Sequence, residues 1–386
     1  MTFISFLCLF ILCIFTLWLI AIYYLDGPEL SEFDISIEDT ANDVFDSHPE
    51  DTENNKKMLN KLAQARQQAI KSPFKAIKIA RAFADELSIE LVSDSQFLAI
   101  DTPEVKGEWV IAPGANPKNR VIFFHGGAFM LGSPLGHRKF TDKLSRLANA
   151  AVLAVSYRRL PGFSRSAGII DAQQAYLWAL ENGPNGPEKL DFLTVAGDSA
   201  GGNLTHMIGS WSAQHAPRKA DCLLSFSPSL DQTFCSPTLQ SNLSSDKVLG
   251  DGLSLITKLP KPLRLWLLFI SMRMNPSNPL ASPVFADLTS LPPTLIHASS
   301  SEMLLGESIR YTNKARAQGS DVRLQVWKDQ IHDWQMFNMG FGSAEVAWNE
   351  VAKFITEQKT RLNLIPDSLE SSSSNDNEKQ LQKNVI

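Results

Sequence analysis

The chain has 386 residues, of which 44% are hydrophobic and 20% are charged, and its formal net charge is −5. This length and composition fit one large domain with a sizeable core and additional segments at the ends. The mild acidity and the absence of Lys/Arg runs exclude a nucleic acid as the expected partner.

Residues 1–25 are expected to be a transmembrane signal-anchor. Residues 3–25 contain neither charge nor proline, and about 20 apolar residues of helix suffice to cross a bilayer. A cleaved signal peptide typically has a basic start, a shorter apolar run and a cleavage site of small residues. The pair Tyr23-Tyr24 at the end of the run suits a membrane interface instead. A cleaved signal and a buried soluble helix remain the alternatives.

Residues 26–54 are acidic and polar and are expected to form a linker. No Lys or Arg occurs between the apolar run and Lys56. Because Lys and Arg favour the cytoplasmic side of a membrane, we expect the part after the anchor to lie outside the cytoplasm, in the periplasm, cell exterior or a lumen. Cys222 and Cys235 are expected to be unpaired, because Cys222 opens an expected strand and Cys235 lies beyond the far end of that strand.

Short apolar, β-rich runs alternate with helix-like stretches along most of the chain, which predicts an α/β fold with a mostly parallel sheet and helices on both faces. The strand-like runs are residues 108–112, 120–124, 151–157, 192–196, 222–226, 293–297 and 322–327. The helix-like stretches between them are residues 139–150, 169–181, 199–212, 304–318 and 343–361.

Three further segments lie outside this alternation. Residues 55–87 have helical spacing, with a break between two helices at Ser72-Pro73. Residues 233–290 are rich in proline and leucine and are expected to form a cap over the carboxyl ends of the strands. Residues 365–386 have low complexity and are expected to be a disordered tail, which leaves residues 55–364 as the main domain.

The segment Gly197-Asp198-Ser199-Ala200-Gly201 follows the strand-like FLTVA and precedes a helix-like stretch, as a nucleophile elbow requires. A sharp strand-to-helix turn strains the backbone at the serine, and the glycines let neighbouring backbone approach. The helix start behind the serine favours negative charge. A glycine-rich turn, including a phosphate-binding one, is the alternative, but the flanking elements favour Ser199 as a nucleophile.

The segment His125-Gly126-Gly127-Ala128-Phe129 follows the strand-like VIFF. A tetrahedral intermediate requires backbone N–H donors that are fixed before negative charge develops. Successive glycines allow a loop to turn its amides inward. We therefore predict an oxyanion hole from the amides of Gly126, Gly127, Ala128 and Ala200, with an ordinary Gly-Gly turn as the alternative.

His332 is the predicted general base, since proton transfer from the serine needs a group that titrates near neutrality. It follows the last strand-like run and comes after the serine in the chain, which is the order of the nucleophile-elbow hydrolases. His206 and His215 are expected on or after the helix behind the serine, His125 is expected to be structural, and His297 precedes the region of the acid. An exposed loop histidine is the alternative for His332.

These motifs resemble those of the hormone-sensitive lipase-like esterases, a branch of the α/β-hydrolases. HGGAF resembles the HGGG motif of that family, and GDSAGG resembles the family's extended nucleophile elbow. SYRRLPG (residues 156–162) resembles the family's DYRLAPE motif, with Ser in place of Asp and Gly in place of Glu. Residues 291–308 and 326–337 resemble its acid and histidine segments, so the likeness runs from about residue 60 to 361. The resemblance implies an α/β-hydrolase fold, esterase activity without metal or cofactor, and a cap partly made of residues 55–90.

The acid differs from the common family pattern, in which an aspartate stands in Asp-Pro-Leu. Here the stretch reads Ser299-Ser300-Ser301-Glu302, with Ser301 at the usual aspartate position and Glu302 at the acid position of other relatives. A serine cannot stabilise an imidazolium ion as a carboxylate does, so Glu302 is the predicted acid. Glu307 and Asp333 are the alternatives, and Glu302 would otherwise be a carboxylate at a helix N-terminus.

The expected function is hydrolysis of carboxylic esters, small-molecule substrates with short to medium acyl chains, where the chain length rests on the resemblance alone. The alternatives are an amidase or a lactone or carbamate hydrolase with the same triad, and a ligand-binding protein without catalysis.

Ala128 stands in place of the family's third glycine. It is expected to keep its N–H available and to narrow the pocket. The apolar residues 263–274 suit either a substrate pocket or membrane docking.

Overall fold

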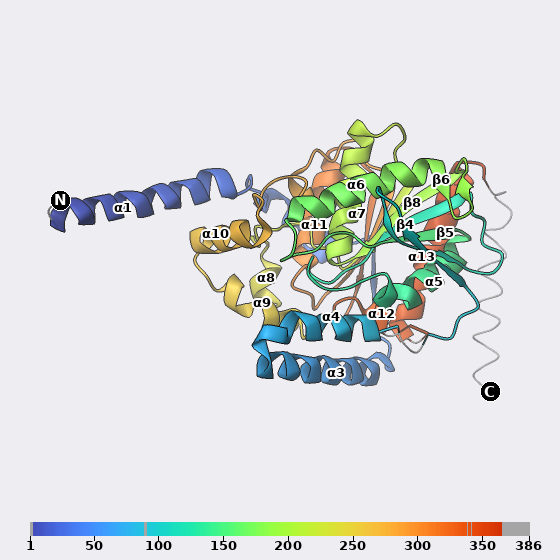
Figure 1. The fold of residues 1–386 in the computed structure, drawn as a ribbon, viewed down its shortest axis with the longest axis horizontal. Coiled ribbons are helices and arrows are strands. Elements are labelled where there is room, and N and C mark those ends of the chain that lie inside the picture. The colour runs from blue at the N-terminus through green and yellow to red at the C-terminus, as the bar shows by residue number, and fades with distance from the viewer. Residues whose placement is uncertain (1–2, 89–90, 338, 341, 365–386) are drawn as a thin grey trace.

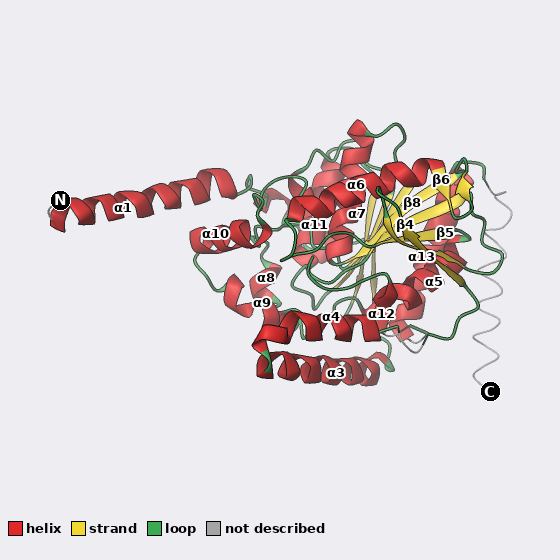
Figure 2. Cartoon of the chain, in the orientation of Figure 1, coloured by secondary structure: helices red, strands yellow, loops and turns green. Residues whose placement is uncertain are grey.

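All seven apolar runs that were expected as strands lie in one nine-stranded sheet, ordered β1-β11-β10-β9-β8-β4-β5-β3-β2 (Figure 2). The computed structural model describes residues 3–88, 91–337, 339–340 and 342–364. β2 pairs antiparallel with β3, and β3 antiparallel with β5, while the other neighbours pair parallel. The predicted α/β fold with a mostly parallel sheet is therefore confirmed. The strands are β1 Asp43–Phe45, β2 Gln96–Asp101, β3 Lys106–Ile111, β4 Asn119–Phe124, β5 Ala151–Val155, β8 Phe192–Asp198, β9 Cys222–Phe226, β10 Thr294–Ser299 and β11 Val322–Trp327, besides the small hairpin β6 Asn182–Gly183 and β7 Gly186–Pro187.

Helices cover both faces of this sheet because its central strands bury alternate side chains on each side (Figure 1). In β4, Ile122 and Phe124 pack towards α6 and α7, while Val121 and Phe123 pack towards α5 and α13. The helices are α5 Arg138–Ala148, α6 Arg165–Glu181, α7 Ala200–His215, α11 Leu305–Ala317, α12 Trp334–Phe337 and α13 Gly342–Arg361, with short 3₁₀ turns η4 Leu135–His137 and η5 Pro283–Phe285.

Residues 26–54 are packed on the domain, which corrects the expectation of a linker. This segment forms η2 Ser31–Phe33 and α2 Ile37–Thr40 and then adds β1 to the sheet beside β11. Leu30 is buried in a cluster with α11, against which Phe33 also packs. Asp34 forms two hydrogen bonds of 2.6 and 2.8 Å with the guanidinium of Arg310. The acidic composition of the segment gave no indication of the apolar contacts of Leu30 and Phe33, nor of the pairing of Asp34 with the nearly buried Arg310.

The N-terminal helix α1 Phe3–Ile20 continues through the π-helical turn η1 Ala21–Leu25 and projects away from the domain (Figure 1). Its apolar side chains are largely exposed. By length and composition, the helical stretch Ser5–Leu25 is able to cross a membrane, and a signal sequence has the same properties.

The two segments expected to form a cap are helical. The first contains α3 Asp51–Lys71, η3 Pro73–Lys75 and α4 Ala76–Glu86, with the break at the expected Ser72-Pro73. The second contains α8 Thr238–Ser241, α9 Gly250–Thr257 and α10 Lys261–Met272. The expected tail, residues 365–386, lies outside the described residues. Cys222 and Cys235 are both free thiols.

The Asp34–Arg310 pair is expected to hold residues 26–54 on the domain. Arg310 is 6% exposed, so Asp34→Ala removes the two charge-assisted hydrogen bonds of a nearly buried guanidinium. We expect a loss of about 2–3 kcal/mol in the free energy of unfolding, measured by urea titration of the detergent-solubilised chain. Glu38→Ala, which removes an exposed carboxylate of the same segment, is the control, and equal stability of the two variants would contradict this role.

Candidate active site

Ser199 stands on a strained turn between β8 and α7. Its backbone angles are φ 49° and ψ −112°, in a region that non-glycine residues rarely occupy. The turn fits only because its neighbours lack side chains: a Cβ on Gly197 would meet the backbone of Gly201, and a Cβ on Gly201 would meet the backbone of Phe124. The spacing of the glycines thus reflects close backbone packing on both sides of Ser199.

His332 lies on the loop between β11 and α12, and its Nε2 is 2.9 Å from Ser199 Oγ. On the other side of the ring, Nδ1 is 3.6 Å from Oε1 of Glu302. Glu302 follows β10 and is 1% exposed, and its Oε1 accepts a hydrogen bond from the hydroxyl of Ser227. The structure therefore brings together the serine, histidine and glutamate that the sequence suggested, in a chain of polar contacts.

The two alternative acids lie elsewhere around the site. Oε2 of Glu307 accepts the backbone N–H groups of Leu230 and, at 2.9 Å, Asp231. Asp333 does contact the histidine, but its Oδ2 lies 3.2 Å from Nε2, the nitrogen that faces Ser199. Among the three candidates, Glu302 is the carboxylate beside Nδ1.

Burial and the neighbouring charges act in opposite directions on the proton affinity of His332. Burial alone would lower the pKa of His332, but the carboxylates of Asp333 and Glu302 outweigh it and raise the pKa to about 10. Burial also raises the pKa of Glu302 and raises the pKa of Asp333 well above the usual range, in each case against the attraction of His332. The protonated ring is thus stabilised from both of its nitrogens.

The loop His125-Gly126-Gly127-Ala128 meets the Ser199 turn through Asp198. Oδ1 of Asp198 accepts the N–H of Gly126 at 2.9 Å, and its Oδ2 lies 3.3 Å from Nε2 of His137. The Gly126 amide is therefore already occupied, which corrects its assignment as an oxyanion donor. No residue of the described part of the chain accepts a hydrogen bond from the amides of Gly127, Ala128 or Ala200.

Ala128 adopts φ 53°, a left-handed conformation that an alanine occupies at a cost of about 1–2 kcal/mol. A glycine, as in the related motif, would not carry this strain. The other buried histidines have structural contacts: Nδ1 of His125 lies 2.8 Å from Gly126 O, and Nε2 of His206 lies 2.8 Å from Ser225 Oγ.

Ser227, His137 and the position of Asp333 were not anticipated. Ser227 directly follows β9, so it lies at the edge where the carboxyl ends of parallel strands meet. This position in the sequence is the feature from which a role of Ser227 near the site could have been predicted. Its Oγ also lies 3.3 Å from the N–H of Asp333, so one hydroxyl links Glu302 to the histidine loop. Among the described residues, no group of three or more His, Cys, Asp or Glu side chains is placed to hold a metal ion.

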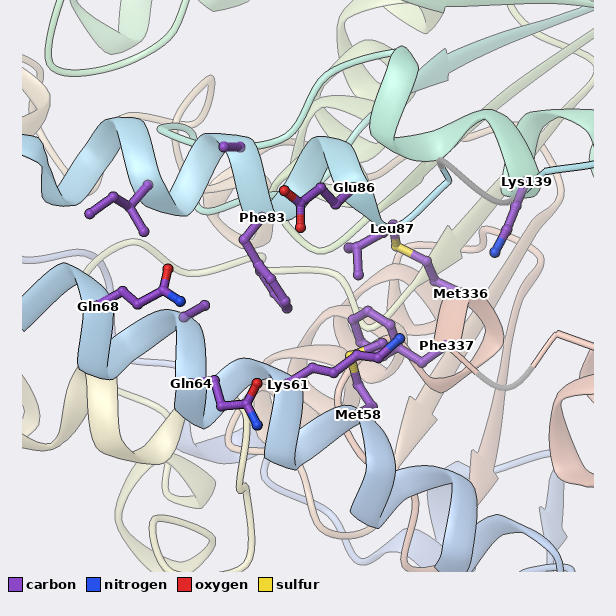
Figure 3. A pocket seen from close by; sticks show the side chains of 13 residues that line it. Met58, Lys61, Gln64, Gln68, Phe83, Glu86, Leu87, Lys139, Met336 and Phe337 are labelled. Carbon is purple, nitrogen blue, oxygen red and sulfur yellow. The ribbon is translucent and has the colours of Figure 1, made fainter.

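A cavity of about 320 Å³ opens beside Ser199 and His332. Small and apolar side chains of α3 and α4 form its outer wall, including Leu62, Ala65 and Phe83. A second cavity of about 700 Å³ lies between α3 and α4 and shares Phe83, Leu87 and Phe337 with the first. Figure 3 shows Phe83 of α4 and Leu87, directly after α4, pointing into this space, with polar Gln64, Lys61 and Lys139 around it. Apolar space therefore adjoins Ser199 beside α3 and α4.

The comparisons with known proteins agree with this geometry. The family model described as alpha/beta hydrolase fold matches residues 121–336, more than half of the chain. The chain belongs to the α/β-hydrolase family. It is similar to an acetyl-hydrolase of Streptomyces hygroscopicus, with 32% identity over 237 residues, 60% of this chain and 73% of the relative. It is also similar to an esterase of Acinetobacter venetianus, with 31% identity over 255 residues, 65% of this chain and 79% of the relative.

The fold is similar to that of an esterase from the bacterial hormone-sensitive lipase family, with a TM-score of 0.65 and 27% identity over 78% of this chain and 97% of the other. The resemblance to hormone-sensitive lipase-like esterases is therefore confirmed, and so is the prediction of a hydrolase. Ser199 follows β8, a central parallel strand, and precedes α7, which is the position of the nucleophile-elbow serine in α/β-hydrolases.

Asp198→Ala is expected to leave the Gly126 amide without its acceptor and to loosen the loop of residues 125–128. We expect kcat for ester hydrolysis to fall about 10- to 100-fold, while KM changes less, because a loop that donates to an oxyanion would act mainly on the transition state. Steady-state kinetics of the variant measures this effect. Asp191→Ala, which alters an exposed aspartate just before β8, is the matched control, and a similar loss in both variants would contradict the assignment.

Proposed function

We propose that this α/β-hydrolase cleaves carboxylic esters of short to medium acyl chain length with a triad of Ser199, His332 and Glu302. The 2.9 Å contact between Ser199 Oγ and His332 Nε2, at a strained turn beneath an apolar cavity, is the observation that carries this proposal. The cavity of about 320 Å³ next to Ser199 suits a small acyl or alcohol group, and the similar protein of Streptomyces hygroscopicus is named an acetyl-hydrolase.

In this mechanism His332 Nε2 takes the proton of Ser199 as Oγ attacks the ester carbonyl. The amides of Gly127, Ala128 and Ala200 donate hydrogen bonds to the oxyanion of the tetrahedral intermediate. His332 then returns the proton to the leaving alcohol, which produces an acyl-enzyme. In the second half, His332 deprotonates a water molecule that attacks the acyl group, and Ser199 is regenerated with release of the acid.

Glu302 holds the ring of His332 through Nδ1 and stabilises the imidazolium ion that forms during each half of the reaction. Ser227 fixes the carboxylate, since its hydroxyl donates to the same oxygen that faces the ring. Asp333 is placed differently, because it competes with Ser199 for Nε2 when the ring is protonated.

The N-terminal helix supports a membrane anchor as the setting of this activity. α1 exposes its apolar side chains over most of its length, as a helix surrounded by lipid does, and the candidate span is only 6% buried. The absence of Lys and Arg from residues 2–55 supports a catalytic domain outside the cytoplasm. The main domain of this proposal extends from residue 26, rather than 55, to 364, with caps at residues 51–86 and 238–272.

A chain-length series of p-nitrophenyl esters tests the function. Wild type is expected to hydrolyse the acetate and butyrate esters with higher kcat/KM than the palmitate ester, and Ser199→Ala is expected to reduce kcat by about 10⁴-fold or more. Ser210→Ala, a buried serine on α7 away from the turn, is the control and keeps its activity. Equal inactivity of wild type and Ser199→Ala on every ester would overturn the proposal in favour of ligand binding or hydrolysis of another bond.

Glu302→Gln and Asp333→Asn separate the two candidate acids. Glu302→Gln is expected to lower kcat about 10³- to 10⁴-fold, since the amide cannot stabilise the imidazolium ion. Asp333→Asn is expected to keep kcat within about tenfold of wild type, because Asp333 does not contact Nδ1. Circular dichroism checks that both variants fold, and the opposite ranking of the two rates would make Asp333 the acid.

The pH profile gives a second, independent test of this arrangement. His332 acts as a base only when it is unprotonated, so kcat/KM is expected to rise with pH as the ring loses its proton. Asp333 raises the pKa of His332, so Asp333→Asn is expected to move this rise to lower pH by about one unit or more. Asp329→Asn, an exposed residue of the same loop, is the control, and an unshifted profile in Asp333→Asn would contradict the effect.

A further inference from the structure

Helix α10 of the cap is fixed against the base of the N-terminal helix. Its Leu265 is buried in a cluster with Ala21 and Leu25, and Trp266 Nε1 donates a hydrogen bond of 2.9 Å to the carbonyl of Leu17. Beyond α10, Asn275 Nδ2 donates at 2.8 Å to the carbonyl of Tyr24. α10 is therefore held at the level of the last turns of the apolar N-terminal helix, as Figure 1 shows.

This level lies within the apolar stretch rather than at its end. Leu17 precedes Leu25 by eight residues, which corresponds to about 12 Å along a helix. If residues 5–25 cross a bilayer, as the proposed function holds, α10 cannot remain in water. It must lie in the interfacial layer, at the boundary of headgroups and acyl chains.

The exposed face of α10 is suited to that layer. Leu263 is 55% exposed, Leu267 44% and Ile270 64%, while the opposite face buries Leu268 and Met272 in the domain. The described part of the chain leaves these three side chains without a covering element, although each is apolar.

Two neighbouring parts of the cap extend this surface at the same end of the molecule (Figure 1). In α9, Leu255 is 78% exposed. At the turn between α3 and α4, Ile70 is 78% exposed and Phe74 is fully exposed. We call the apolar side chains of Leu255, Leu263, Leu267, Ile270, Ile70 and Phe74 the cap face.

Exposed basic residues accompany the cap face and match the chemistry of lipid headgroups. Lys71, Lys75 and Lys78 lie within four residues of Phe74 in the sequence, and Lys258 and Arg273 flank α10. Apolar side chains that enter the acyl region, with cations at the height of the phosphates, are the composition of interfacial helices.

We propose that the cap face docks into the surface of the same lipid bilayer that residues 5–25 cross. This inference rests on the proposed membrane anchor. The docked turn between α3 and α4 lies at one end of the two helices that enclose both cavities, so an ester dissolved in the bilayer reaches Ser199 between these helices without crossing bulk water.

Photo-labelling of the full chain in vesicles tests the docking. The vesicles contain phosphatidylcholine, a minor share of phosphatidylserine, and a phosphatidylcholine with a diazirine in its acyl chain, and adducts are mapped by peptide mass spectrometry after irradiation. We expect adducts on α1, on α10 and at residues 70–74. Ile170 and Leu177 of α6, with exposures of 46% and 41%, are an internal control that stays unlabelled.

Leu263→Asn/Leu267→Asn/Ile270→Asn is expected to reduce the α10 adducts by roughly an order of magnitude relative to those on α1. Ile170→Asn/Leu177→Asn is the matched variant and leaves the adducts unchanged. Adducts on α1 without any on α10 would overturn the docking and would indicate that a second copy or another protein covers the cap face. Adducts on neither helix would overturn both the anchor and the docking.

Hydrolysis of p-nitrophenyl butyrate by the same vesicles separates this inference from the esterase activity. Activity without α10 adducts contradicts the docking alone, whereas α10 adducts without activity contradict ester hydrolysis alone. The triple variant is expected to keep its rate on this water-soluble ester, because the three side chains lie outside the cavities. It is expected to lose activity on a medium-chain ester dissolved in the vesicles.

Discussion

The carboxylate of Asp198 joins the two loops on which the active site depends. It is the last residue of β8, directly before Ser199, and it accepts the amide of Gly126 in the neighbouring loop after β4. Burial alone would raise the pKa of Asp198. The opposing effects, which include those of His137 and of the Gly126 amide, are together larger, and the pKa of Asp198 lies below its usual value, so the carboxylate stays charged and binds both partners. The strained serine and the free amides of Gly127 and Ala128 therefore keep a fixed relation, as oxyanion stabilisation requires.

The sheet could be predicted from the sequence because its strands are buried on both faces and read as continuous apolar runs between turns. Ser199 and His332 could be predicted because their motifs occur in a fixed order along the chain. The contacts of Asp333 and Ser227 could not, since they depend on how loops from β9 and β11 meet in space. Gly126 matched the expected motif, yet its amide is occupied by Asp198, and no sequence spacing reveals that choice of partner.

The error at residues 26–54 has a different cause. Averaged composition predicted a linker. However, β1 needs only three residues to pair with β11, and Leu30 and Phe33 attach the preceding turn to the cluster around α11. Isolated apolar residues in an acidic stretch give no periodic pattern, so only the partner surface on α11 makes them part of the core. β2 also lies outside the predicted strands; it is an edge strand with four of its six residues exposed, so it does not form a continuous buried run.

The short strand β1 has a consequence for how such an enzyme would meet its substrate. A membrane anchor at residues 5–25 would be joined to the sheet by a short and packed connection, because the chain reaches β1 within eighteen residues of Leu25 and Asp34 binds Arg310 on the way. The turn between α3 and α4 would then keep a constant height and a constant tilt relative to the membrane. Esters held in that membrane would then reach the enzyme by lateral diffusion in two dimensions, with every encounter occurring in a preset orientation.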